Sequence, residues 1–249
     1  MNQTVNEIQQ AFRQLRLSET AEEIPDFLRQ AEQKSWTYLE LIEKLTTYEL
    51  RKRENKSMER RLKWANFPYQ KTLSEFHLEE QTAISKRQLE QLKELNWLEQ
   101  YYNLILLGPP GVGKTALSIG LGIEAILNGY HVGFVTMGDL MYLLKTESYT
   151  RKSELRLNRL RKSDLIIIDD LMYLAIDPHE ASLFFQFIQE MYEKCALILT
   201  SNKAPEQWSE LSSDPGITSA ILDRLLHRVE VIHMNGDSYR MKHQERIFN

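Results

Sequence analysis

The sequence contains a single cysteine, Cys195, which excludes a disulfide framework and any zinc site built from several cysteines. One thiol also fits a reducing compartment. Apolar runs are short, such as Leu104–Leu107, and none approaches the ~18 residues of a membrane span. The first residues include no apolar segment of the secretory kind. We therefore expect a cytoplasmic protein with no membrane partner.

Glycine is absent before Gly108, and Pro25 is the only proline among the first 65 residues. Apolar residues in this part recur with the spacing of a helix. The pattern predicts a small all-helical N-terminal domain over 1–66, which ends in a basic stretch. A further helix is expected over about 78–97.

From Asn103 onward the pattern changes to short apolar runs that alternate with helical segments. Fully apolar strands separated by helices predict a parallel sheet covered on both faces, in an α/β domain over 67–249. Strands are expected at 103–107, 132–136, 165–169, 196–200 and 229–233. Helices are expected at 114–127, 139–147, 153–161, 179–193 and 217–227.

A phosphate-binding loop lies between the first expected strand and the helix that follows it. The loop fits the pattern G-x-x-x-x-G-K-[ST]. Glycines let backbone amides curl around phosphate, and a helix N-terminus favours an anion. Lys114 is expected to neutralise oxygens of the β- and γ-phosphates of a bound nucleotide, and Thr115 to offer a hydroxyl to Mg²⁺. ATP and Mg²⁺ are thus the predicted cofactors, bound by Gly108, Pro109, Pro110, Gly111, Val112, Gly113, Lys114 and Thr115.

Two later strands end in polar side chains. Asp169 and Asp170 close the strand at 165–169, and Asn202 follows the strand at 196–200. Successive side chains of a strand point in different directions, so the two carboxylates can take different tasks. We expect Asp169 to belong to the Mg²⁺ shell, Asp170 to polarise the attacking water, and Asn202 to orient that water or contact the γ-phosphate. The predicted activity is Mg²⁺-dependent ATP hydrolysis.

The net charge of −4 argues weakly against nucleic-acid binding, but the basic residues gather in two segments. Residues 51–63 and 145–162 each contain seven basic residues and two acidic ones. Clustered cations matter more than the total charge when the partner is a polyanion. The alternative interpretation is two solvated helix faces. The DNA-binding candidates are Arg51, Arg53, Lys56, Arg60, Arg156, Arg159 and Arg161.

The order of these motifs, followed by Ile221-Leu222-Asp223-Arg224-Leu225, resembles the AAA+ class of ATPases. The resemblance implies that Asn202 is sensor 1 and that Arg224 is an arginine finger, which reaches the γ-phosphate of a neighbouring subunit in a homo-oligomer. Arg228, one helical turn further, is the rival for that role. The segment 236–240 resembles the closing motif of the DnaC/DnaI helicase loaders. Arg240 is a candidate phosphate contact there, with no separate C-terminal lid expected.

Nearly the whole chain is similar to the IstB-like family of transposition helpers. The resemblance includes Leu15-Arg16-Leu17, the basic stretch, Phe67-Pro68-Tyr69 with Lys71-Thr72-Leu73, and the phosphate-binding loop. It implies ATP-dependent assembly on double-stranded DNA, selection of a target site, and activation of the transposase of the same insertion sequence. A helicase loader, a small-molecule kinase and a non-hydrolysing scaffold are the alternatives, and a loader would use its N-terminal region to grip a helicase.

Overall fold

A computed structural model of the chain describes residues 2–76, 84–172, 176–236 and 238–239. The chain divides into two compact units, Met1–Arg60 and Arg61–Asn249. The sequence interpretation placed the domain boundary after residue 66, and helix α3 (Tyr38–Ala65) continues through the division at Arg60. None of the described helices combines the length and the hydropathy that crossing a bilayer requires.

The N-terminal unit is helical, as the composition predicted. It contains α1 (Asn2–Gln14), α2 (Ser18–Lys34) and most of α3. Glu49 of α3 is buried and accepts hydrogen bonds from Thr20 Oγ1 at 2.6 Å and from Arg53 Nε at 2.7 Å. Burial alone would raise the pKa of Glu49, but these hydrogen bonds outweigh it and lower the pKa. An ionised, hydrogen-bonded carboxylate therefore ties α2 to α3.

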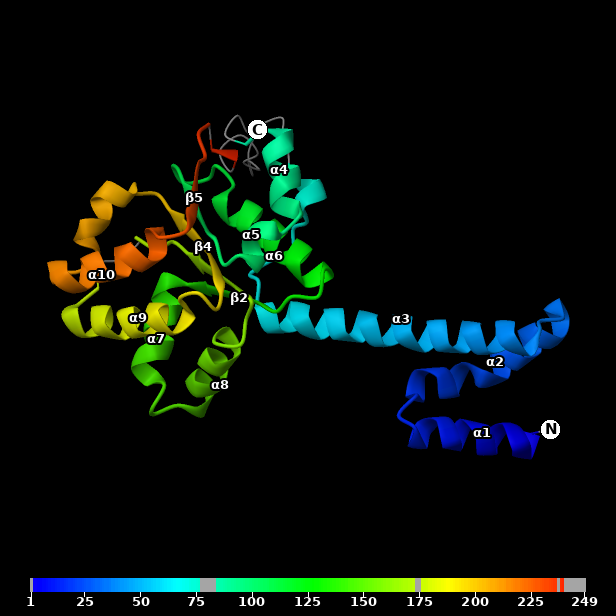
Figure 1. Cartoon of the computed structure of the whole chain (residues 1–249). Helices are drawn as coiled ribbons and strands as arrows, with labels where there is room; N and C mark the ends of the chain where they lie inside the picture. The colour runs from blue at the N-terminus through cyan, green and yellow to red at the C-terminus, as the bar shows by residue number, and fades with distance from the viewer. Residues whose placement is uncertain (1, 77–83, 173–175, 237, 240–249) are drawn as a thin grey trace, which may run out of the picture. The chain divides into compact units, whose positions relative to one another are not determined.

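The second unit is built on a parallel sheet of five strands in the order β2-β3-β4-β1-β5 (Figure 1). The predicted strands are confirmed, and the fourth extends one residue further than expected. A parallel arrangement brings the carboxyl ends of all strands to one edge of the sheet. The strands are β1 (Asn103–Leu107), β2 (Val132–Thr136), β3 (Leu165–Asp169), β4 (Ala196–Ser201) and β5 (Val229–His233).

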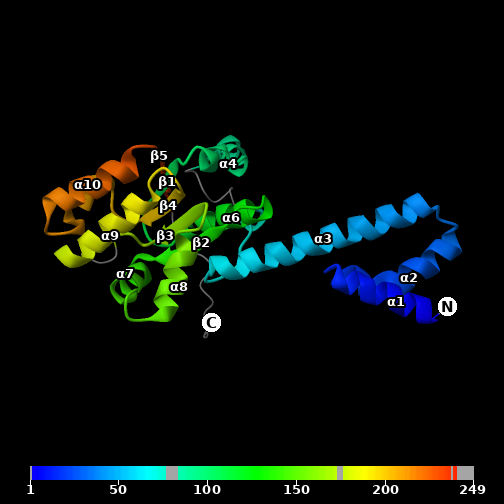
Figure 2. The same ribbon diagram turned by 60° about the horizontal axis from the view of Figure 1, so that its bottom comes forward.

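Helices connect the strands and cover the sheet (Figure 2). The single helix expected over 78–97 is wrong in its described part: α4 and α5 are separate, because Leu95 between them adopts a left-handed backbone with φ 60°. Residues 78–83 of that expectation lie outside the described residues. The helices of this unit are α4 (Lys86–Lys93), α5 (Asn96–Glu99), α6 (Lys114–Leu127), α7 (Met137–Thr146), α8 (Arg151–Leu160), α9 (Pro178–Met191) and α10 (Pro215–Leu226), with 3-10 turns at Leu73–Glu75 and Pro205–Leu211.

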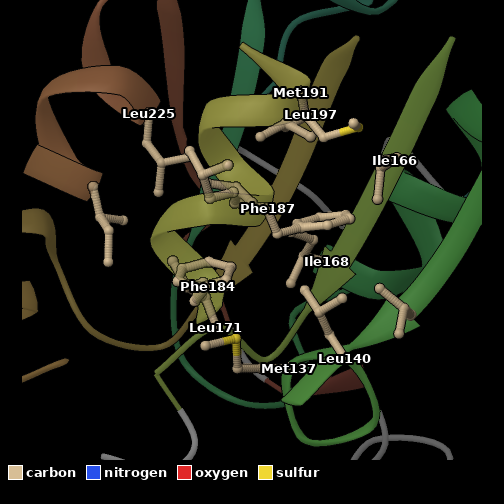
Figure 3. Packing of buried hydrophobic residues seen from close by; sticks show 14 of the residues in the cluster. Met137, Leu140, Ile166, Ile168, Leu171, Phe184, Phe187, Met191, Leu197 and Leu225 are labelled. Atoms are coloured by element: carbon tan, nitrogen blue, oxygen red, sulfur yellow. The ribbon is translucent and has the colours of Figure 1, made fainter. Parts of the chain in front are cut away.

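The main core lies between one face of the sheet and helices α7 to α10. Phe184 and Phe187, on one face of α9, pack toward Ile166 and Ile168 of β3 (Figure 3). The alternate residue Ile167 is equally buried but does not belong to this cluster, because successive strand side chains point to opposite faces. Apolar residues of α6 are buried as well, so the sheet has hydrophobic cover on both faces.

Asn103, at the start of β1, fixes the position of the strand that carries the phosphate-binding loop. Its buried side chain accepts a hydrogen bond from the backbone N–H of Leu197, 94 residues further along, at 3.0 Å. It also donates to the carbonyl of Leu225, 122 residues further along, at 2.9 Å. A single amide therefore connects β1 to β4 and to α10, and satisfies its own buried polar atoms in doing so.

Candidate functional site

The loop at Gly108–Gly113 leaves the end of β1 and leads directly into α6, as the motif predicted. Lys114 is the first residue of α6 and is only 7% exposed. Its Nζ donates to the carbonyl oxygens of Gly108 at 2.7 Å and Pro109 at 2.9 Å. The ammonium is thus held within the loop, next to the backbone amides of a helix N-terminus, where an anion is stabilised.

The segment that follows β5 runs along this loop and requires a glycine there. Gly108 has φ +151°, and a Cβ on it would lie 2.0 Å from the carbonyl oxygen of Met234. Met234 N donates to the carbonyl of Leu107 at 2.6 Å, and Tyr239 N donates to the carbonyl of Gly111 at 3.0 Å. Residues far along the chain therefore form part of the wall around the loop.

Asp169, at the end of β3, is buried between two hydroxyl groups. Thr115 Oγ1 donates to its Oδ1 at 2.9 Å, and Thr200 Oγ1 donates to the same oxygen at 2.6 Å. Burial raises the pKa of Asp169 above its ordinary value, and the hydrogen bonds from Thr200 and Thr115 oppose that rise. The carboxylate is therefore costly to bury and favours a nearby cation.

Asp170 has a different environment from its neighbour. Its side chain is exposed and its backbone is left-handed, with φ 55°. Its N–H donates to Thr200 Oγ1 at 2.9 Å, so one hydroxyl holds both acidic residues in place. The two adjacent carboxylates are thereby directed apart, one onto Thr115 and the other outward. The division of tasks expected for the two acids stays a prediction.

A cavity of about 680 Å³ opens beside these residues, which is a size suited to a small-molecule ligand. The predicted site residues Gly111, Lys114, Asp169, Asp170 and Asn202 all line it. The structure thus brings the phosphate-binding loop, the two acids and Asn202 together around one space. The remaining lining residues are Pro68, Tyr69, Lys71, Phe76, Gly113, Pro110, Thr115, Ala116, Phe134, Thr136 and Tyr239.

Sequence reasoning missed the aromatic part of this lining. Tyr69, Phe76 and Tyr239 line the cavity, and Lys71 Nζ lies 5.2 Å from the centroid of the Tyr239 ring. The aromatic and proline run at the start of the α/β domain, Phe67-Pro68-Tyr69, was the available signal. Its role in the cavity depends on contacts between residues far apart in the sequence, which the spacing of residues along the chain does not reveal. Thr200 was missed for the same reason, since its hydroxyl acts on residues of the neighbouring strand.

The donor set fits Mg²⁺. The Thr115 hydroxyl and the Asp169 carboxylate lie 2.9 Å apart and both offer oxygen, which is the ligand that this hard cation prefers. Protein sites for Mg²⁺ commonly supply one or two such ligands and leave the others to phosphate and water. Thr115 and Asp169 would hold the ion, which when bound would neutralise charge on the phosphates.

Arg224 lies in the last turn of α10 and does not line the cavity described above. Its Nη1 donates to the carbonyl of Ala220 at 2.8 Å, and its guanidinium carbon lies 4.7 Å from the centroid of the Phe185 ring. The rival Arg228 is exposed, and its Nη1 contacts the carbonyl of Gln100 at 3.4 Å. Arg240 lies outside the described residues.

Two basic residues of the first cluster already have partners within the N-terminal unit. Arg53 donates to Glu49 and, at 2.8 Å, to the carbonyl of Arg16, and Lys56 forms an ion pair with Glu19. Arg51 and Arg60 are exposed, and no such contact of theirs occurs among the described residues. The structure therefore separates the first cluster into residues that support the fold and residues directed to solvent.

The second cluster is engaged within the α/β unit to a greater extent. Arg156 donates to three backbone carbonyls, and Arg161 forms ion pairs with Glu147 and Glu190. The guanidinium of Arg159 lies 5.5 Å from the centroid of the Trp64 ring, and its side chain is exposed. Of these three DNA-binding candidates, Arg159 is the most accessible to a polyanion.

Comparison with known proteins identifies the family. The model of the family described as IstB-like ATP binding protein matches residues 10–247. The chain belongs to this IstB-like family. It is an ATP-binding protein with the AAA+ P-loop fold.

Several relatives of this IstB-like protein come from insertion sequences. It is 39% identical to the IS232 ATP-binding protein of Bacillus thuringiensis subsp. berliner, over 92% of this chain and 91% of that protein. It is 36% identical to the IS21 ATP-binding protein of Pseudomonas aeruginosa, over 97% and 91%. It is 35% identical to an IS21-like ATP-binding protein of Bacteroides fragilis, over 98% and 92%.

Solved structures confirm the fold. DnaI matches with a TM-score of 0.56 and 21% identity over 68% of this chain and 90% of that one. The DnaC helicase loader matches with a TM-score of 0.50 and 19% identity over 69% and 97%. At these identities the likeness concerns the fold, which is the AAA+ core with a parallel sheet that the motifs predicted.

Proposed function

We propose that this IstB-like protein hydrolyses ATP with Mg²⁺ in the cavity beside Lys114. The observation that carries the proposal is the hydroxyl and carboxylate network of Thr115, Asp169 and Thr200, with Asp170 exposed beside it. Lys114 would neutralise phosphate oxygens, and Thr115 and Asp169 would hold the ion. Asp170 would accept a proton from the attacking water, and Asn202 would orient that water.

The aromatic part of the lining supports a place for the nucleoside. The phosphates belong at the amides of the P-loop, so the base and ribose would occupy the space near Pro68, Tyr69 and Tyr239. Aromatic faces stack on a planar base, and Lys71 beside Tyr239 would restrain that ring. These residues would therefore contribute affinity for the whole nucleotide beyond that for its phosphates.

For the biological role, we propose an ATP-dependent helper of the transposase of the same insertion sequence, which assembles as a homo-oligomer on double-stranded DNA. The relatives named for insertion sequences support this role over that of a helicase loader. Arg51, Arg60 and Arg159 are the exposed candidates for phosphate contacts. Arg224 would complete the site of a neighbouring subunit, since it lies outside the lining of its own cavity.

The catalytic proposal is tested by two substitutions in the full chain. Lys114→Ala should abolish ATP binding, because the phosphates lose the cation within the loop. Asp170→Asn should bind ATP normally and hydrolyse it about 10²- to 10⁴-fold more slowly, because the water loses its base. Titration with a fluorescent ATP analogue measures binding, and phosphate release measures turnover. If Asp170→Asn hydrolysed ATP at the wild-type rate, Asp170 would not be the base that accepts the proton of the attacking water.

The role on DNA is tested separately. Double-stranded DNA should bind the wild-type chain and raise its ATPase rate, and the purified transposase of the insertion sequence should associate with that complex. Lys114→Ala serves as the control that cannot respond through ATP. If the chain did not bind double-stranded DNA and instead bound a replicative helicase, the result would favour the alternative function of a helicase loader.

A further inference from the structure

We propose that Arg156 is a positioning residue for ATP binding, which fixes one wall of the nucleotide cavity by holding the end of α3 against β2. The inference rests on the function proposed above and assigns Arg156 a task other than DNA binding. Its guanidinium donates to the carbonyls of Trp64 at 2.8 Å, Ala65 at 3.3 Å and Phe134 at 2.7 Å.

These three acceptors need a donor for reasons of backbone geometry. Trp64 and Ala65 are the last two residues of α3, and the final carbonyls of a helix have no partner within it. Phe134 lies in β2, which ends the order of the described strands and pairs only with β3. Carbonyls on the outer side of such a strand lack a strand partner. A planar guanidinium can span several acceptors and also favours the negative end of the helix dipole.

The carbonyls held by Arg156 lie directly next to the cavity along the chain. Asn66 reverses the backbone with φ 62°, and Pro68 and Tyr69 follow within the lining. The ring of Phe67 between them packs edge-on against Phe134, with 6.2 Å between centroids. Tyr69 lies only four residues after Ala65, and the packed ring of Phe67 lies between them, so a shift at Ala65 acts on a short segment that is already held by side-chain packing.

The same guanidinium also holds β2, while the Phe67 ring packs on α6. The carbonyl of Phe134 accepts a hydrogen bond from Arg156, and Phe134 is one of the residues that line the cavity. Phe67 is seated on α6 because Gly122 leaves room for it: a Cβ there would lie 2.9 Å from the Phe67 ring. Loss of the Arg156 contacts would therefore loosen Phe67 and Phe134 together, and with them the aromatic wall.

The expected consequence is a selective loss of affinity for the nucleoside part of ATP. Loss of the stacking of a base on an aromatic side chain costs about 10- to 100-fold in affinity. Arg156→Gln should therefore raise the dissociation constant for a fluorescent ATP analogue by up to about 10- to 100-fold. Arg156→Lys should raise it less, because lysine keeps the charge but not the fork. Inorganic tripolyphosphate, measured by competition, should bind both variants as it binds the wild type.

The matched control is Arg151→Gln, which removes the same charge from an exposed position of α8 and should leave ATP affinity unchanged. The affinities for ATP and tripolyphosphate are measured at a temperature well below the unfolding midpoint of each variant. If Arg156→Gln does not fold, the comparison is made with Arg156→Lys. Wild-type ATP affinity in the Arg156 variants, or an equal loss for ATP and tripolyphosphate, overturns the positioning role. If Lys114→Ala also bound ATP normally, the proposed site itself would be wrong.

Discussion

Asp169 shows how the site opposes the stability of the fold. Burial raises the pKa of Asp169 above the ordinary 3.8. At a pH between the unfolded and the folded pKa, the folded protein therefore keeps a proton on Asp169 that the unfolded chain has released. Stability therefore falls as the pH rises from the unfolded pKa through the folded one, and above that range the cost of burying the charge is fully present. The residue is retained at a position where an uncharged side chain would suit the fold better.

This cost predicts the behaviour of Asp169→Asn. Its amide oxygen can still accept from Thr115 and Thr200, so at neutral pH the variant should unfold at a temperature higher by about 2–4 °C per kcal/mol of relieved burial cost. Mg²⁺-dependent ATP binding should weaken at the same time. Thermal unfolding without nucleotide measures the first effect. Asp170→Asn is the exposed control, and an unfolding midpoint that rises equally in both variants contradicts the explanation.

Thr200 provides a second test, because one hydroxyl holds both acids. Thr200→Val keeps the shape but removes the donor to Asp169 and the acceptor for Asp170, so turnover should fall by about tenfold or more for two lost hydrogen bonds of ~1 kcal/mol each. ATP affinity should change little, since the P-loop is untouched. Thr200→Ser restores the hydroxyl and should restore turnover, whereas equal loss in both variants would point to packing instead.

Among the elements, those fixed by local pattern could be predicted. The strand Leu165–Asp169 is a run of buried apolar residues, and α6 follows directly from the phosphate-binding motif. The interruption of the helix at Leu95, between α4 and α5, could not be predicted, since nothing in the residue type of Leu95 favours a left-handed backbone. Nor could the cavity role of Tyr69, or the difference between the engaged Arg156 and the exposed Arg159. These depend on long-range contacts, to which counting charges and aromatics is insensitive.

The exposed part of the first basic cluster predicts a defined salt response. Arg51→Gln with Arg60→Gln should weaken double-stranded DNA binding and reduce the slope of log affinity against log salt by about 0.9 per lost phosphate contact. Basal ATPase activity should be unchanged, because both residues belong to the N-terminal unit. Binding isotherms over a salt series provide the measurement. Arg13→Gln with Arg29→Gln gives the same change in charge outside the cluster. If this control variant reduced the slope of log affinity against log salt equally, a DNA-binding site at Arg51 and Arg60 would be excluded.

At the scale of the whole assembly, the proposal that Arg224 acts in trans implies that each subunit alone has an incomplete site. The ATPase rate per subunit should therefore rise with protein concentration. Arg224→Ala should reduce turnover steeply, toward the about 10³-fold effect of arginine fingers in related phosphoryl transfer. Mixing Arg224→Ala with Lys114→Ala should restore part of the activity, because some interfaces then combine an intact loop with an intact finger. No recovery at any ratio of folded subunits would place Arg224 in cis or favour Arg228.

The hydrogen bonds of Asn103 also bear on the order in which the molecule forms during translation. The partner at Leu197 leaves the ribosome 94 residues after Asn103, which at ~5–20 residues per second is a delay of about 5–20 s. Throughout that interval β1 has neither β4 nor β5 to pair with, whereas the N-terminal helices can already form and the β2–β3 pair can form once Asp169 has been made. The nascent chain therefore displays the apolar segment Leu104–Leu107 unpaired, as a target for chaperones, until most of the protein has been made.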